Sequence, residues 1–180
     1  VLASRSEEVV VDRLFAGNCQ LNTCLQDLMQ AAQTTLQLTP QQRQRSLVRI
    51  DAGGGSAPNF TWLLLQGYHI LGKACSAQQA QRLATTVQQW DDDPHVPGRQ
   101  VGWVNEAPRD FVRPVRRVAV RCRKPNGQWG IGILVCSLSD QDLFQVTPRS
   151  PHAPPQEQSV LLALLWLYDQ RGGGIETSFK

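Results

Sequence analysis

Residues 46–56 read SLVRIDAGGGS, and this stretch decides the fold class that we expect for the chain. Its first half is a short apolar strand, and its second half is an acid followed by a turn with three consecutive glycines. Glycine allows turns and close backbone approaches that other residues do not. In open α/β sheets, ligands gather at the carboxyl ends of the strands, which is where Asp51 would lie.

The segments around this stretch alternate between strand and helix. Downstream we expect a helix containing Trp62–Leu65, a strand over 68–74 and a helix over 77–89. Upstream we expect strands over 1–3 and 8–15, an amphipathic helix from Leu21 to Ala32 and a short helix beginning at Thr39-Pro40. This alternation predicts an α/β sheet over residues 1–90.

The pattern changes after Trp90. Proline and glycine mark linkers at 91–98 and 148–155, and strand-like segments lie at 100–104, 115–123 and 129–137. Asn126-Gly127 between the last two segments indicates a tight hairpin. We expect residues 91–155 to form a β-rich insertion that does not continue the α/β layer, with helix returning over 156–170 at the start of a C-terminal region, 156–180.

Composition indicates an ordinary globular protein, with 41% hydrophobic and 18% charged residues. The longest apolar run, Val160–Tyr168, is too short to cross a membrane, and no secretory leader opens the chain. The five cysteines form no CxxC pair, so we expect reduced core residues of a cytoplasmic protein. Of the 18 basic residues 15 are arginine, whose planar fork matches phosphate oxygens.

Two acidic residues are candidates for chemistry. Asp51 is placed either to bind a metal ion at the end of its strand or simply to cap the turn that follows. The second candidate, Glu176, follows Tyr168, Arg171 and three glycines at 172–174. Each glycine would cost about 1 kcal/mol within a helix, so the helix is expected to break there. A helix end followed by a plain loop is the structural alternative.

A basic segment is the third feature. If this segment is a strand on which Val118, Val120 and Cys122 face the protein core, then Arg117, Arg121 and Arg123 point together to the other side. Such a row suits a DNA backbone, with stacking surface from Trp103 and Trp129 nearby. The solvated face of a hairpin would read the same way.

Three blocks together resemble the signature blocks of insertion-sequence DDE transposases: RIDAGGGS at 49–56, WLLLQGYHILGKACS at 62–76 and YDQRGGGIETSFK at 168–180. The chain is similar in particular to the bacterial group whose last block carries a Tyr-Arg-Glu-Lys signature. The opening VLASRSEEVVVDRLFAGN also resembles the sheet segment that precedes the second catalytic Asp of such enzymes.

The resemblance implies a ribonuclease H-like mixed sheet with flanking helices, interrupted by a β-rich insertion. It implies two Mg²⁺ ions held by Asp, Asp and Glu, where two metals hold the attacking and leaving oxygens of an in-line displacement. Asp51 matches the second Asp and Glu176 the Glu, as catalytic and metal-binding residues. Tyr168 and Arg171 match signature residues that lie near DNA phosphates.

The implied activity is cleavage of double-stranded DNA at transposon ends and strand transfer into target DNA, in the bacterial cytoplasm near the nucleoid. A homodimer of the complete enzyme is compatible with this reading. Three features depart from the family pattern. The first Asp is expected upstream of the residues present, since Asp12 does not match it. Four residues instead of three separate Arg171 from Glu176, and Lys180 follows Glu176 too closely to be the signature Lys.

We therefore expect a catalytic-domain fragment that lacks the first strand of its sheet and is inactive alone. A DNA-binding remnant without catalysis is the first alternative, which DNA affinity without metal-dependent cleavage would favour. The second is a pseudogene product with no function, which would be insoluble and would bind nothing.

Overall fold

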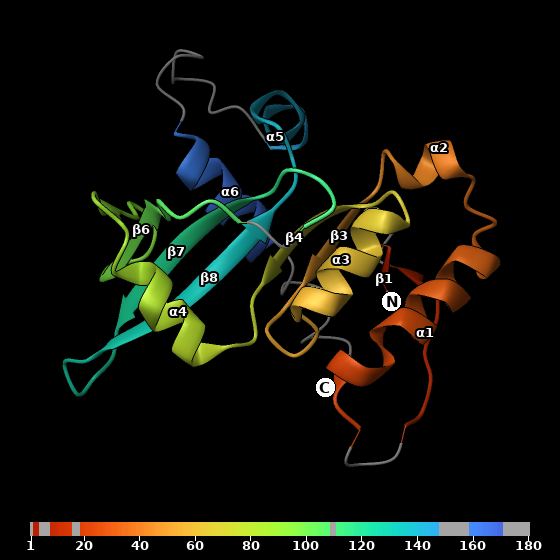
Figure 1. Cartoon of the computed structure of the whole chain (residues 1–180), viewed down its shortest axis with the longest axis horizontal. Helices are drawn as coiled ribbons and strands as arrows, with labels where there is room; N and C mark the ends of the chain where they lie inside the picture. Colours follow the sequence, from red (N-terminus) through yellow and green to blue (C-terminus); the bar gives the residue numbers. More distant parts are fainter. Residues whose placement is uncertain (1, 4–7, 16–18, 109–110, 148–158, 171–180) are drawn as a thin grey trace.

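The computed structural model describes residues 2–3, 8–15, 19–108, 111–147 and 159–170, which form a mixed α/β fold around a six-stranded sheet (Figure 1). The strand order across this sheet is β3-β4-β8-β7-β6-β5. Its members are β3 (Leu47–Ile50), β4 (His69–Lys73), β5 (Asp91–Asp92), β6 (Arg99–Trp103), β7 (Arg116–Arg123) and β8 (Trp129–Cys136). A separate antiparallel pair consists of β1 (Leu2–Ala3) and β2 (Glu8–Val9).

The sheet contains one parallel pair, and β4 joins it to an antiparallel meander. β3 runs parallel to β4, with Ile50 opposite Gly72. The other side of β4 pairs antiparallel with β8, where Leu71 lies opposite Cys136. The strands of the middle third therefore continue the sheet that begins with β3 and β4. This corrects our expectation that they would stay apart from the α/β layer, and the reason is that β4 had a second edge left to pair.

The helices are α1 (Leu21–Thr35), α2 (Pro40–Arg43), α3 (Ala57–Leu65), α4 (Ala77–Ala84), α5 (Asp140–Val146) and α6 (Val160–Asp169). All except α1 begin at a Ser or Thr whose side-chain oxygen accepts a backbone N–H of the first turn. Such caps satisfy donors that the helix leaves unpaired. At Thr39 the cap is reciprocal, because the Gln42 side chain also accepts from the Thr39 backbone.

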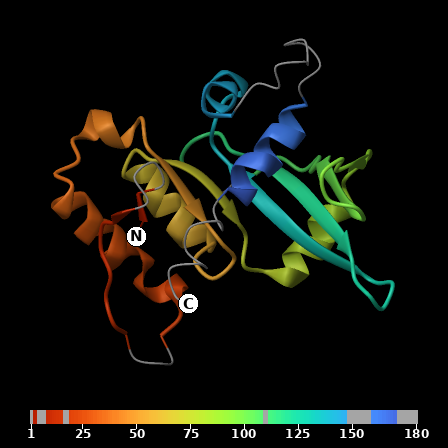
Figure 2. The ribbon, with the colours of Figure 1, turned by 180° about the vertical axis from the view of Figure 1, so that it is seen from behind.

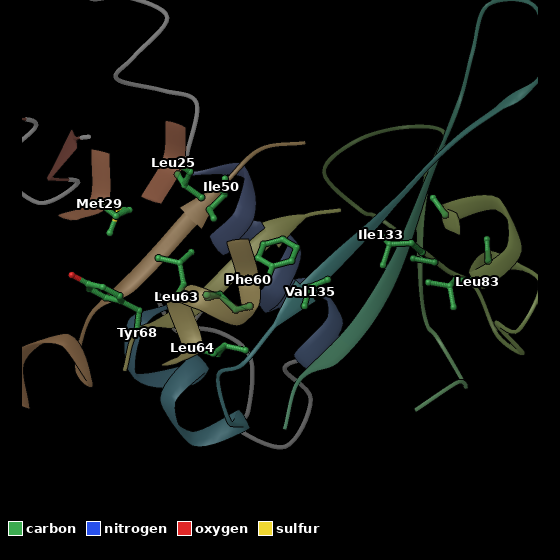
Figure 3. Close-up of a cluster of buried hydrophobic side chains, with 14 residues drawn as sticks. Leu25, Met29, Ile50, Phe60, Leu63, Leu64, Tyr68, Leu83, Ile133 and Val135 are labelled. Atoms are coloured by element: carbon green, nitrogen blue, oxygen red, sulfur yellow. The ribbon is translucent and has the colours of Figure 1, made fainter. Parts of the chain in front are cut away.

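Two cores lie on opposite faces of the sheet. In Figures 1 and 2, α3 and α4 cover one face and α6 covers the other. The first core includes Leu25 of α1, Phe60 and Leu63 of α3, Leu83 of α4 and Ile133 of β8 (Figure 3). The second core packs α6 against β4, β6, β7 and β8, and its fully buried members are Leu71, Val101, Val118, Cys136, Leu143 and Leu164.

Most of the expected elements are confirmed. The hairpin at Asn126-Gly127 is present, and Gly127 has the positive φ (79°) that this position requires. Two elements are shorter than expected: β2 ends at Val9, and α4 ends at Ala84, where the Thr85 hydroxyl bonds the Arg82 carbonyl. Neither α5 nor β5 was predicted: β5 has two residues and lies within the linker expected at 91–98, and α5 is a helix of only seven residues between the last strand and the linker expected at 148–155.

The five cysteines are free thiols, but only Cys24 and Cys136 are buried; the expectation of core positions is wrong for Cys19, Cys75 and Cys122. Within the described ranges, none of the helices combines the length and the apolar character that a membrane span requires.

Helix α3 offers a matched test of the first core. Leu63 is 0% exposed, whereas Leu65, two residues on, is 65% exposed. Leu63→Ala should lower the free energy of unfolding by about 2–5 kcal/mol, because it leaves a cavity. Leu65→Ala should cost less than about 0.5 kcal/mol. Urea unfolding measures both, and equal losses would contradict the placement of α3.

Candidate functional site

Asp51 lies directly after β3, at the carboxyl end of the parallel strand pair, and its side chain is exposed. Its Oδ1 accepts the backbone N–H of Gly53 at 2.9 Å, which is the hydrogen bond of an Asx turn. Asp51 therefore caps the turn, and this bond uses one of its two carboxylate oxygens. Asp51 is held in one orientation with capacity to spare for a cation.

The loop after Asp51 is fixed by a buried amide. Asn59 of α3 is 2% exposed, and its Nδ2 donates to the Gly54 carbonyl at 3.1 Å. The same amide group donates to the Asn22 carbonyl at 2.9 Å, and Asn59 Oδ1 accepts from Gln26 at 3.2 Å. Asn59 therefore ties the loop to α1 as well as to α3.

Gly55 makes the closest approach between this loop and the sheet. A Cβ added at Gly55 would lie 1.7 Å from the carbonyl oxygen of Lys73, at the end of β4. The contact is sealed by the backbone N–H of Cys75, which donates to the Gly55 carbonyl at 3.0 Å. Only glycine fits here, which gives a structural reason for one of the three glycines in the loop.

Arg49 connects β3 to the end of α6. Its guanidinium donates to the Leu167 carbonyl at 3.0 Å, across 118 residues of sequence. Positively charged groups are favourable at the carboxyl end of a helix. The bond brings the end of α6, including the buried Tyr168, to the same strand that carries Asp51 two residues later.

Of the candidate residues in the last block, only Tyr168 falls within the described part of the chain; Arg171 and Glu176 lie outside it. Their expected roles stay predictions. Among the described residues no group of three or more His, Cys, Asp or Glu side chains is arranged to hold a metal ion. Asp51 is the one residue of the expected carboxylate set that the structure places.

The arginines of β7 alternate as expected but do not form a free row. Arg117 is buried, and it donates to the backbone carbonyl of Glu106 at 2.7 Å and lies 3.6 Å from its carboxylate. Arg121 is half-buried, and Arg123 is exposed near the hairpin. Their availability to a phosphate therefore increases from Arg117 to Arg123.

Two tryptophans enclose the Arg121 guanidinium, which lies 4.1 Å from the ring centroid of Trp90 and 4.5 Å from that of Trp129. Its Nε also donates to Gln100 at 2.8 Å. Each cation–π contact contributes about 0.5–2 kcal/mol. Arg121 of β7 thus contacts side chains from β6 and β8 and holds these strands together. Trp129 remains 37% exposed as a stacking surface.

Sequence reasoning missed three residues that build this region: Asn59, Arg49 and Arg99. Arg99 bonds the carboxylates of Asp93 and Asp169, both at 2.5 Å, and so ties β6 to the end of α6. A lone Asn or Arg carries no periodic signal. Each of the three also bonds a partner that lies 37, 70 or 118 residues away, and only the assembled fold reveals those bonds.

Comparison with known proteins adds no assignment: no family model, no curated protein and no solved structure matches the chain.

The loop carries a second matched prediction. Gly55→Ala should destabilise the protein by about 1–3 kcal/mol or more, because the methyl group would strike backbone that cannot rotate away. A Cβ at Gly53 would meet side chains and no backbone, the nearest atom being Asp51 Oδ1 at 3.2 Å, so Gly53→Ala should cost less than about 1 kcal/mol. Thermal and urea unfolding of the two variants would show the difference. A Gly55→Ala protein as stable as Gly53→Ala would mean that the loop does not rest on β4.

Proposed function

We propose that this chain is part of the catalytic domain of a DDE transposase, which cleaves and joins DNA with Mg²⁺. The observation that carries the proposal is the position of Asp51. It is an oriented, exposed carboxylate at the carboxyl end of β3, followed by a loop fixed by Asn59 and Gly55. This is the place in an open α/β sheet where ligands collect.

Two further features support it. In the described part of the chain β3 pairs on one side only, so its outer edge is available to the first strand of a ribonuclease H-like sheet. The Arg49–Leu167 bond also joins the carboxyl end of α6 to β3. Glu176 follows the last residue of α6 by seven positions (176 − 169), a length of chain that can span about 23 Å when extended.

In this proposal Asp51 and Glu176 hold Mg²⁺, since carboxylate oxygens are the ligands that this ion prefers. The metal ions would lower the pKa of the attacking water and neutralise charge on the phosphate. Asp51 contributes a carboxylate fixed by Gly53, so little reorganisation is needed on binding. Arg171 would orient the DNA phosphates; Tyr168, the other residue expected near them, is buried at the end of α6. The first Asp of the family pattern is not among these residues, so the chain alone is expected to show no strand cleavage.

The DNA-binding remnant remains the second candidate, favoured by the cations near the β7–β8 hairpin. Metal dependence separates the two functions. A remnant would bind DNA equally with Mg²⁺ and with EDTA, and Asp51→Asn would leave its binding unchanged.

Metal binding tests the proposal directly. At ten times the dissociation constant, Mg²⁺ should stabilise the native chain by about 1.4 kcal/mol. For a protein of this size that raises Tm by about 3–6 °C. Asp51→Asn and Glu176→Gln should each abolish the rise. Differential scanning fluorimetry with MgCl₂, at constant ionic strength, measures it.

Asp27→Asn is the matched control, because Asp27 is an exposed acid on α1 and lies outside the loop that follows β3. It should keep the full Mg²⁺ effect. An equal rise of Tm in the native chain and in Asp51→Asn would refute the assignment of Asp51.

A further inference from the structure

A basin lies on the face of the sheet that α6 leaves uncovered beyond its carboxyl end. Its volume is about 370 Å³, and its wall includes Leu165, Tyr168 and Asp169 of α6. Its floor is formed by β7 and β8, including Val120, Gly130 and Gly132. This face is opposite to the one on which Arg117, Arg121 and Arg123 lie, because side chains alternate along β7.

Two lysines lie across the glycine floor. A Cβ at Gly132 would lie 2.7 Å from Cε of Lys73, and one at Gly130 would lie 3.1 Å from Cε of Lys124. Glycine at both positions therefore makes room for the two side chains. The whole chain has only three lysines, and two of them meet in this one basin.

The charge of the basin is positive. Its third cation, Arg99, is already paired with Asp93 and Asp169. Neither Lys73 nor Lys124 forms an ion pair with any described carboxylate. Two ammonium groups in one basin suit an anion, and each ammonium offers three donors to phosphate oxygens.

The basin also adjoins the candidate metal site. The carbonyl of Lys73 is the group against which Gly55 packs, and Gly55 belongs to the loop that begins at Asp51. Tyr168, in the basin wall, is the first residue of the last signature block. A nucleic-acid strand with one phosphate bound by the two lysines would therefore pass between the end of β3 and the end of α6.

We infer that Lys73 and Lys124, above Gly130 and Gly132, form a binding site for the phosphodiester backbone of DNA. This inference rests on the proposed function and names the surface through which it would engage its substrate. The arginine-rich face of β7 is the other basic surface. It is weaker as a site because Arg117 is bound to Glu106 and Arg121 is enclosed by tryptophans.

The test compares two double variants of the full chain that each remove two positive charges. Lys73→Gln with Lys124→Gln should weaken binding to a short fluorescein-labelled DNA duplex about tenfold or more at low salt. It should also reduce the slope of log K against log salt by about 1.8, since each phosphate contact contributes about 0.9. Fluorescence anisotropy between about 50 and 200 mM NaCl measures both quantities.

Arg13→Gln with Arg45→Gln is the control, because both residues are exposed and lie outside the basin. It should weaken binding less than threefold or so, by the general loss of charge. Lys73→Arg with Lys124→Arg should keep the native salt slope. Circular dichroism and Tm of every variant establish that each is folded, since Lys124 is exposed, Lys73 is half-buried at the end of β4, and neither belongs to the two hydrophobic cores.

The outcomes separate this site from the proposed function. The native chain could bind DNA with a steep salt slope while the two charge-removing variants lose the same amount of affinity, or none. Either result would overturn the assignment of the basin and leave the proposed function standing. No binding of DNA by the native chain would overturn both. Inorganic phosphate, added at constant ionic strength, should not displace the duplex. Stabilisation of the native chain by phosphate that is lost in Lys73→Gln with Lys124→Gln, while duplex binding is unchanged in that variant, would assign the basin to free phosphate and overturn its assignment to the DNA backbone.

Discussion

Strand β4 is the element on which the rest of the structure depends, because it pairs with β3 on one side and with β8 on the other. The first pairing is parallel and the second antiparallel, so β4 is the strand at which the parallel pair ends and the antiparallel meander begins. Its residues Ile70 and Leu71 are both 0% exposed and point into the two different cores. Through β4, the antiparallel strands and the loop that holds Asp51 belong to one sheet.

Close packing at the end of β4 explains the shape of the candidate site. Gly55 lies against the carbonyl of Lys73, while the side chain of the same lysine crosses Gly132. One residue thus supports the Asp51 loop with its backbone and lines the basin with its ammonium group. Arg49 of β3 and Arg99 of β6 each form a polar bond with the carboxyl end of α6, and these bonds hold that helix end against the sheet. Metal and phosphate sites would be neighbours because they share a single strand end.

The two basic surfaces of the sheet differ in what their cations already do. On one face, Arg117 and Arg121 are committed to a carbonyl and to two indole rings. Arginine suits such roles because its guanidinium is planar and weakly hydrated. On the other face, the two lysines lie over glycines, and neither forms an ion pair with a described carboxylate. A count of basic residues cannot make this distinction, which depends on the neighbours of each charge.

Sequence by itself determined the elements and the candidate acids. Local signals were sufficient for the capped helices after Thr39 and Ser56, for the Asn126-Gly127 hairpin and for the strand that ends at Asp51, because each depends on residues close in the chain. Tertiary structure alone decided that β8 joins β4, that Asn59 fixes the loop and that two lysines meet above Gly130 and Gly132. Those facts depend on partners from 5 to 67 residues apart. Which residues become partners depends on the strand edges and cavities that remain when the sheet assembles. The periodicity of the sequence does not show which residues these are.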